Sequence, residues 1–580
     1  MRSENNEKQL QASLFQRCME QVGFFKGRKI PVYTAGELEY EKSVANSNLL
    51  YRFDRPACVV QPEHESHVRI VVKRAKDMEL TMRVKNGGHS FAGFSSIQDG
   101  ISIDLVNMKR VDLDMDAMTI TMDAGALWAH AYHELINEHH NGFVINGGRC
   151  PSVGVSGFTL GGGLGPFTRS FGLGSDSLIE ARIVTPKEKN GVVHVTRDDT
   201  DPEKKKLFWA LCGAGGNNFG VVTQLKMKVE ELHHKDVVAG VYTWSPFQDP
   251  KSQEHFTTTM TEFYLAQWSN EMTIDSSWLM DLKDSREVPG VRFLAYYNGL
   301  ETDFDREVDQ RLKSCIKGPE ETKSLPQQLK DRTLQEASTR FLHETLVAQW
   351  SEETQRSLPS NAMFKISTSF SFTGFSEANK ESLSKIIDVL KKRLVAFKKQ
   401  FKGEEGSIKV SWIHSGGKSN EKEPDYSAYP WRGCVYHTYV MIEWKDKWLE
   451  KDMREFLGTL NKELRGYSMN ELGVYVNFPD ETLDENTYER AYYGENRKEL
   501  QRIKAVWDKG NIFGWSHGVR PGPHVDGASE AVTSSPPPPS NSAICKGFAN
   551  PREMLDKFAA KGWATHTPGL GSTLVGPDVL

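Results

Sequence analysis

Two glycine-rich stretches carry most of the information in this sequence: Arg83-Val84-Lys85-Asn86-Gly87-Gly88-His89-Ser90 and Gly147-Gly148-Arg149-Cys150-Pro151-Ser152-Val153-Gly154-Val155-Ser156-Gly157. Each stretch places one nucleophilic side chain, His89 or Cys150, beside glycines. Because glycine has no Cβ, the backbone can approach a ligand closely and its N–H groups can line an anionic group such as a pyrophosphate. The two stretches therefore predict a ligand-binding loop system that carries two reactive side chains.

The composition around these loops is that of an ordinary globular protein, with 38% hydrophobic and 26% charged residues. A length of 580 residues is enough for two or more regions with a core of their own. The formal net charge of −5 does not indicate a nucleic-acid partner. No apolar run approaches the roughly 18 residues of a membrane span, so no membrane association is expected.

The cysteines are scattered and odd in number, which does not predict a disulfide framework. Without a Cys-x-x-Cys pair or a Cys/His cluster at zinc spacing, no metal site is predicted. The first residues lack the pattern of a secretory signal, and the chain contains no Asn-x-Ser/Thr sequon. These features favour a cytoplasmic or other intracellular protein, or a chain whose leader has been removed. The seven cysteines are Cys18, Cys58, Cys150, Cys212, Cys315, Cys434 and Cys545.

The pattern along the chain predicts an α+β protein with several parts. Short strands and glycine-rich turns dominate the beginning, whereas longer charged helices appear from about residue 232. We expect a first domain at 1–235 with its core at about 52–232, a second α+β domain with an antiparallel sheet at 236–470, a return to the first domain at 471–520, and a proline-rich linker and tail at 521–580.

Individual elements follow from the same periodicity. Strands are expected at 80–84, 101–105, 118–122, 408–413, 435–444 and 475–478. Helices are expected at 127–139, 381–401 and 496–509, with an apolar turn at 142–145. In the tail, a stiff proline-rich linker at 534–540 and a short helix at 551–561 are expected.

Dinucleotide enzymes often carry Gly-x-Gly-x-x-Gly after a strand, and this sequence does not. The run at 161–166 has proline at the last required glycine, and the run at 213–218 has asparagine there. A Rossmann site is therefore not predicted. Each glycine run by itself also fits a simple tight turn.

Taken together and in order, the motifs resemble the FAD-binding region of the vanillyl-alcohol-oxidase superfamily, in particular its berberine-bridge-enzyme-like branch. The resemblance covers about residues 55–520 and implies a two-part PCMH-type FAD-binding domain followed by a substrate domain. It rests on the segments 85–90, 150–157 and 207–223, and on 475–478, 492–496 and 508–513, which resemble the carboxy-terminal signature of the family.

The resemblance implies a flavin attached at two points. In the family, the histidine of the first loop bonds the flavin 8α-methyl and the cysteine of the second bonds flavin C6, which assigns these roles to His89 and Cys150. Val153 stands where family members differ in oxygen reactivity, and valine is the oxidase-like residue. The other positions expected to contact FAD are Lys85, Asn86, Gly87, Gly88, Ser90, Gly148, Pro151, Val153, Gly154, Gly157, Gly220, Val222 and Asn477.

The expected strand 435–444 carries candidate catalytic residues on one face, among them His437 and Tyr439. In relatives the position that matches Tyr439 holds a glutamate or glutamine that acts as base or positioner. A tyrosine could take up a proton there only if a neighbour, such as a cation, lowered its pKa. Tyr475 shares a face with Asn477, and the resemblance places that face near the isoalloxazine. Tyr439, Tyr475 and His437 are thus catalytic candidates, and ordinary polar pocket lining is the alternative.

The resemblance implies an FAD-dependent oxidase that takes a hydride from an organic substrate and passes electrons to molecular oxygen, giving hydrogen peroxide. Family members oxidise sugars, alcohols and alkaloid- or polyketide-type intermediates. Without a signal or a sequon, an alcohol or related intermediate of specialised metabolism is the favoured small-molecule substrate. Two alternatives stay open: a carbohydrate oxidase whose leader has been removed, and a flavin-containing cyclase that performs no redox chemistry.

Overall fold

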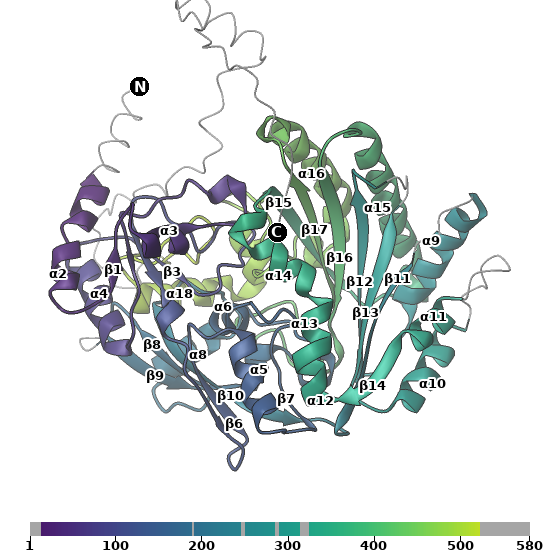
Figure 1. The fold of residues 1–580 in the computed structure, drawn as a ribbon, viewed down its shortest axis with the longest axis horizontal. Coiled ribbons are helices and arrows are strands. Elements are labelled where there is room, and N and C mark those ends of the chain that lie inside the picture. Colours follow the sequence, from purple (N-terminus) through teal and green to yellow (C-terminus); the bar gives the residue numbers. More distant parts are fainter. Residues whose placement is uncertain (1–12, 188–190, 245–249, 285–288, 314–323, 523–580) are drawn as a thin grey trace, which may run out of the picture. The chain divides into compact units, whose positions relative to one another are not determined.

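The strands in the described part of the chain are divided among three sheets (Figure 1). The computed structural model describes residues 13–187, 191–244, 250–284, 289–313 and 324–522. The linker expected at 534–540 and the helix expected at 551–561 lie outside these ranges. Among the described helices, none combines the length and the apolar character needed to span a bilayer.

The first sheet positions the first glycine-rich loop. Its order is β1-β2-β4-β3, and β4 pairs in parallel with both β2 and β3. Helix α4 (Glu65–Asp77) connects β2 to β3 and buries Val68, Val71, Val72 and Ala75 on one face. The loop with His89 leaves the end of β3. The strands are β1 (Val32–Tyr33), β2 (Cys58–Val60), β3 (Met82–Lys85) and β4 (Ile101–Asp104).

The second sheet positions the second loop. Its order is β5-β6-β10-β8-β9, and β7 pairs with the end of β10. The turn expected at 142–145 is wrong, because residues 143–145 form the strand β7. The long strand β10 extends beyond its pairing with β8, and β7 pairs with this extension. The strands are β5 (Val111–Asp114), β6 (Thr119–Asp123), β7 (Phe143–Ile145), β8 (Leu178–Val184), β9 (Val192–Thr196) and β10 (Val221–Glu231).

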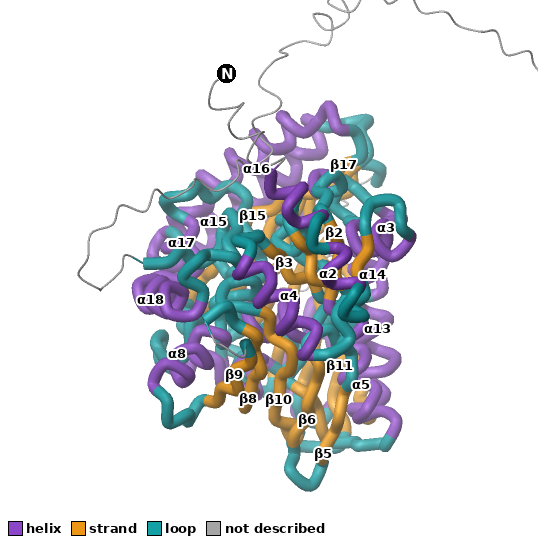
Figure 2. Tube along the Cα trace, turned by 90° about the vertical axis from the view of Figure 1, so that its left-hand side faces the viewer, coloured by secondary structure: helices purple, strands orange, loops and turns teal. Residues whose placement is uncertain are grey.

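The helices that accompany these sheets include α5, which precedes the second loop in sequence, and α6, which begins within it. Figure 2 shows α8 and α18 on the same side of the molecule as β8 and β9. Residues 13–19 are also helical. The named helices are α2 (Val22–Lys26), α3 (Leu38–Val44), α5 (Trp128–Asn137), α6 (Val155–Leu160), α7 (Thr168–Phe171), α8 (Pro202–Leu211), α17 (Tyr488–Tyr493) and α18 (Arg497–Trp507).

The third sheet is antiparallel throughout and has the order β14-β11-β13-β12-β16-β17-β15. Helices α9, α15 and α16 stand along it in Figure 1. The strands are β11 (Asp236–Trp244), β12 (Met272–Asp281), β13 (Gly290–Tyr297), β14 (Thr333–Ala337), β15 (Phe364–Thr373), β16 (Gly406–His414) and β17 (Cys434–Trp444). The helices of this region are α9 (Pro250–Leu265), α10 (Glu301–Arg311), α11 (Leu325–Asp331), α12 (Ser338–Arg340), α13 (Leu346–Gln349), α14 (Ser351–Ser357), α15 (Lys380–Gln400) and α16 (Glu450–Leu464).

The two faces of β17 belong to different cores. Val440 and Ile442 pack into the core shared with α15 and α16. Tyr439 and Met441 point to the opposite side and belong to the core of the first two sheets. This alternation is what the sequence predicted for 435–444, and the helices and antiparallel sheet confirm the expected α+β fold.

The strand expected at 475–478 is wrong, because these residues form a turn. The Phe478 N–H donates to the Tyr475 carbonyl over 2.9 Å, which closes the turn. Tyr475 and Asn477 nevertheless meet, since the Asn477 amide nitrogen donates to the Tyr475 hydroxyl over 3.1 Å.

A buried ion pair fixes the segment that follows. Lys504 Nζ lies 2.7 Å from Asp508 Oδ2, and both side chains are inaccessible to solvent. Lys504 also donates to the carbonyl of Asn218 in the first part of the chain. The Asp508 carboxylate accepts the backbone N–H groups of Ile512 and Phe513. One carboxylate thus secures α18 and the residues after it.

Replacing Asp508 by alanine is expected to lower the free energy of unfolding by about 3–5 kcal/mol, because it leaves a buried ammonium group without a counter-charge. Urea unfolding of the variant measures this loss. Asp388→Ala, at an exposed position on α15, serves as the control and is expected to change stability by no more than about 0.5 kcal/mol. Equal stability of the two variants would contradict the role given to this pair.

Candidate active site

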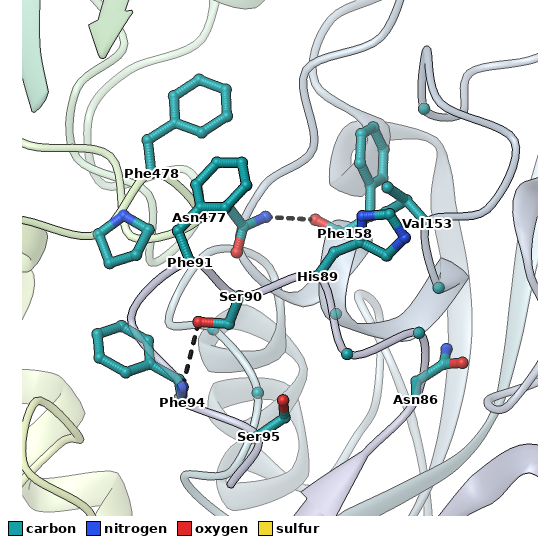
Figure 3. A pocket seen from close by; sticks show the side chains of 18 of the residues that line it. Asn86, His89, Ser90, Phe91, Phe94, Ser95, Val153, Phe158, Asn477 and Phe478 are labelled. Carbon is teal, nitrogen blue, oxygen red and sulfur yellow. Dashed lines mark hydrogen bonds between the residues drawn. The ribbon is translucent and has the colours of Figure 1, made fainter. Parts of the chain in front are cut away.

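A cavity of about 320 Å³ lies where the two glycine-rich loops, the turn at 475–479 and the third sheet come together. Figure 3 shows Asn86, His89, Ser90 and Phe91 along the first loop, and the Asn477 amide donating to the Phe158 carbonyl. The structure thus brings together most of the residues that the sequence singled out. Those that line the cavity are Asn86, Gly87, Gly88, His89, Ser90, Gly148, Cys150, Val153, Gly154, Gly157, Gly220, Val222, Tyr439, Tyr475 and Asn477.

His89 and Cys150 contact the same hydroxyl group. Ser152 Oγ lies 3.2 Å from His89 Nε2 and 3.2 Å from Cys150 Sγ. Thr354 of α14 adds a second hydroxyl, 3.4 Å from the sulfur. Burial lowers the pKa of His89 to about 4, so its imidazole is neutral and keeps a nucleophilic lone pair at neutral pH. Two nucleophiles from separate loops are therefore bridged by one hydroxyl group.

The glycines of the two loops allow the loops to pack on each other. The Asn86 amide nitrogen donates to the carbonyls of Ala124 and Ala126 and to the Ser156 hydroxyl. A Cβ on Gly154 would lie 2.4 Å from Asn86 Cγ, and one on Gly87 would lie 2.7 Å from the Gly154 nitrogen. A side chain at Gly154 would displace the Asn86 amide, and a side chain at Gly87 would displace the backbone at Gly154.

Other glycines face the open cavity. A Cβ on Gly157 would meet no atom within 4 Å, and one on Gly216 would meet only Leu160, at 4.0 Å. Both glycines line the cavity, and at a further part of it the rings of Phe94 and Trp515 lie 4.3 Å apart. Exposed backbone N–H groups can hold a pyrophosphate, and aromatic side chains can hold planar rings. The residues present therefore fit a flavin dinucleotide.

Gly157→Ala is expected to weaken FAD binding at least tenfold, which is about 1.4 kcal/mol, while leaving the fold intact. Its methyl group would enter the cavity, whereas Gly458→Ala, on α16, adds an equally unhindered methyl outside it. FAD titration should be done with alanine at both His89 and Cys150, so that binding is reversible. Equal affinities in the two glycine variants would show that Gly157 does not border the cofactor.

Tyr439 reaches the cavity from β17 with its ring between two phenylalanines. The ring centroids of Phe478 and Phe91 lie 4.7 Å and 6.0 Å away. Burial raises the pKa of Tyr439, while the positive charge of Lys409 and a hydrogen bond with Ser411 oppose the rise. The net shift of the Tyr439 pKa is upward, so the phenol is protonated at neutral pH. The cation Lys409 opposes this rise but does not bring the pKa below its ordinary value, as a catalytic base would require.

Tyr475 also lines the cavity, but its oxygen is already engaged. It accepts the Gly163 N–H over 2.8 Å and the Asn477 amide over 3.1 Å. Burial raises the pKa of Tyr475 well above its ordinary value. Tyr475 is therefore a neutral hydroxyl group held in a fixed position.

Three predicted residues do not line the cavity: His437, Lys85 and Pro151. His437 Nε2 lies 2.8 Å from the Tyr429 hydroxyl, and burial lowers the pKa of His437 to about 3. Lys85 Nζ donates to the Ser43 carbonyl. The side chains of His437 and Lys85 are therefore each directed to a partner outside the cavity lining.

A wall of charged side chains was missed by the sequence analysis. Glu353 and Arg356 of α14, Lys365 of β15 and Glu443 of β17 line the cavity, and Lys409 of β16 pairs with Glu353. No strong periodicity marks α14, so its charges could not be told from a solvated surface. The alternation along 435–444 does place Glu443 on the same face as Tyr439, but it does not reveal the cations that pair with it.

The charges of this wall are mutually paired. Arg356 Nε lies 3.6 Å from Glu443 Oε2, and Lys365 Nζ lies 3.4 Å from Glu443 Oε1. Burial alone would raise the pKa of Glu353. The positive charges of Lys409 and Arg356 outweigh this effect and lower the pKa to about 2. Glu353 is therefore ionised at neutral pH and is a weak proton acceptor.

Comparisons with known proteins agree with this site. Residues 56–194 match the family model of an FAD binding domain, and residues 474–520 match that of berberine and berberine-like proteins. The uncharacterized FAD-linked oxidoreductase YgaK of Bacillus subtilis is 25% identical over 84% of this chain and 96% of its own length.

Solved structures share the fold. Chitooligosaccharide oxidase superposes with a TM-score of 0.71 at 19% identity, covering 88% of this chain and all of its own. Berberine bridge enzyme from Eschscholzia californica gives 0.70 at 19% identity with the same coverage. Since the two family models match at either end of the cavity-forming region and the FAD-linked oxidoreductase YgaK aligns with most of the chain, this chain belongs to the berberine-bridge-enzyme-like family of FAD-linked oxidases.

Proposed function

We propose that this oxidase carries FAD attached covalently to both His89 and Cys150. In this proposal it takes a hydride from an alcohol carbon, or a related carbon, of a small organic molecule and returns the electrons to molecular oxygen as hydrogen peroxide. The observation that supports it most is the meeting of the two nucleophiles, each 3.2 Å from Ser152 Oγ, in the cavity that Tyr439 borders. FAD, when bound, supplies the electron acceptor.

The side chains around the cavity then have defined tasks. The Tyr439 phenolate receives the proton that the substrate loses and becomes the phenol, and the nearby charge of Lys409 increases the fraction of phenolate available for this step. Phe91 and Phe478 on either side of Tyr439 keep water from the reacting carbon. Val153 borders the cavity, and we assign it the oxygen-permitting role that the family resemblance implies.

The charged side chains of this wall indicate which class of substrate the cavity accepts. Arg356 and Glu443 offer hydrogen-bond donors and acceptors to hydroxyl groups, and Trp350 offers an aromatic face in the same cavity. This combination favours a hydroxylated ring compound, such as a specialised-metabolite alcohol. Sugars have the same chemistry, so a carbohydrate oxidase is the second candidate.

The test has two stages. First, the protein is precipitated with acid, and the flavin in pellet and supernatant is measured. Flavin that stays with the pellet and maps to peptides containing His89 and Cys150 supports the two attachments, and flavin only in the supernatant refutes them.

Second, the protein is mixed anaerobically with panels of aromatic alcohols and of oligosaccharides. Bleaching of the flavin absorbance identifies the substrate class, and one hydrogen peroxide per substrate on admission of air supports oxygen as acceptor. Turnover of a substrate without bleaching would replace the oxidase proposal by a non-redox cyclase.

A further inference from the structure

We propose that Ser152 is a shared positioning and proton-transfer residue for the attachment of FAD to both His89 and Cys150. This inference rests on the proposed covalent flavin. Two hydroxyl groups contact the Cys150 thiol in the described part of the chain, those of Ser152 and Thr354, and of these Ser152 alone also contacts His89.

The local backbone brings this hydroxyl to the thiol. The Val153 N–H donates to the Cys150 carbonyl over 3.1 Å, which closes a four-residue turn. Pro151 stands at the second position of that turn, where its restricted φ is favourable. Ser152 is the third residue, so its side chain returns to within 3.2 Å of Cys150 Sγ.

A hydroxyl group has one donor and two acceptor lone pairs, so Ser152 can serve both neighbours at once. When its oxygen accepts the Nε2–H of His89, the Nδ1 atom of the ring keeps its lone pair and is the nucleophile. The same hydroxyl can donate to Cys150 Sγ and so stabilise the thiolate, which is the reactive form of cysteine. The Ser152 hydroxyl can thus activate both nucleophiles for bond formation with the flavin.

The attachment chemistry balances with the acceptor already proposed. Each attachment replaces one flavin C–H bond by a C–N or C–S bond. The hydrogen of the C–H bond leaves as a proton, as does the hydrogen of the imidazole or thiol, and two electrons are released. Molecular oxygen takes up both electrons and both protons, so one hydrogen peroxide forms for each bond.

Thr354 provides a matched control within the site. Its hydroxyl lies 3.4 Å from Cys150 Sγ and comes from α14, a different element. No contact between Thr354 and His89 is present in the described part of the chain. Removing the Thr354 hydroxyl therefore perturbs the cysteine alone, whereas removing the Ser152 hydroxyl perturbs both nucleophiles.

The experiment follows bond formation rather than turnover. Full-length wild type, Ser152→Ala, Ser152→Thr and Thr354→Val are produced with limiting riboflavin and then incubated with FAD in air. Samples are quenched in acid at intervals, and peptide mapping measures the flavin bound at His89 and at Cys150 separately. Ser152→Ala is expected to slow both bonds at least about tenfold, Ser152→Thr to restore both, and Thr354→Val to slow the Cys150 bond only.

Three results would overturn the inference. Wild-type rates for both bonds in Ser152→Ala would show that the hydroxyl is not needed. Failure of Ser152→Thr to restore both rates would show that the hydroxyl is not the operative group. Absence of any attached flavin in the wild type would refute the covalent flavin itself, and with it the role of Ser152.

Discussion

Replacing Tyr439 by phenylalanine is expected to lower kcat at least about 100-fold, the usual loss when a positioned acid–base group is removed. The flavin content should not change, because Tyr439 borders the cavity from the third sheet and contacts neither attachment residue in the described structure. Stopped-flow measurement of anaerobic flavin reduction isolates this step. Tyr475→Phe is the comparison: it removes a hydroxyl that is held by Gly163 and Asn477, and a smaller loss is expected.

The pH dependence of the same step gives an independent check. Burial raises the pKa of Tyr439 above its ordinary value, so the phenolate is scarce at neutral pH and its fraction grows as pH rises. The rate of flavin reduction should therefore increase with pH into the alkaline range. A rate that is independent of pH between neutral and alkaline conditions would exclude Tyr439 as the base.

Two charge variants should move this pH profile in opposite directions. Lys409 lowers the pKa of Tyr439 and Glu353 raises it. Lys409→Met is therefore expected to shift the rising limb to higher pH, and Glu353→Gln to lower pH. Shifts in the same direction would indicate a change in structure rather than in charge.

Replacing both His89 and Cys150 by alanine is expected to change the share of protein with acid-stable flavin from nearly all to none. Each single variant should retain one attachment, because the other nucleophile keeps its place in the cavity. Acid precipitation followed by absorbance of the redissolved pellet measures the attached flavin. Cys58→Ala is the control, since Cys58 is buried in β2 and does not line the cavity.

The double variant should still bind FAD, because the glycine backbone and the aromatic side chains of the cavity remain. Gel filtration with FAD present should therefore show a yellow protein whose flavin is released by acid. Attached flavin in the double variant would mean that a different residue forms the bond. If neither single variant retained attached flavin, the two attachments would depend on each other.

Local sequence carried the information on the two loops. Glycine is needed at positions 87 and 154, where the loops pack on each other. Both glycines are part of the two sequence motifs, so the motifs alone indicate this close packing. The strand at 435–444 was predicted correctly because strict alternation separates its two faces. In contrast, the pattern at 475–478 predicts a strand where the structure has a turn, because a short apolar run does not reveal whether a partner strand exists.

The charged wall and the position of His437 depended on partners far away in the chain. Glu353 and Arg356 reach the cavity only because α14 lies against it, and α14 has no marked apolar stripe. His437 has the same alternation as Tyr439 but bonds to Tyr429, which fills the space at that point of the strand. A pattern along one strand gives the face of a residue but not what lies opposite.

The sequence by itself determined the α+β class, the FAD-binding family and the pair of nucleophiles, because each depends on the type and order of residues within short segments. Only the tertiary structure decided that Ser152 lies between His89 and Cys150, that Tyr439 has a raised rather than lowered pKa, and that α14 forms a wall of the cavity. The physical reason is that burial, charge and contact are set by strand pairing and packing between distant segments.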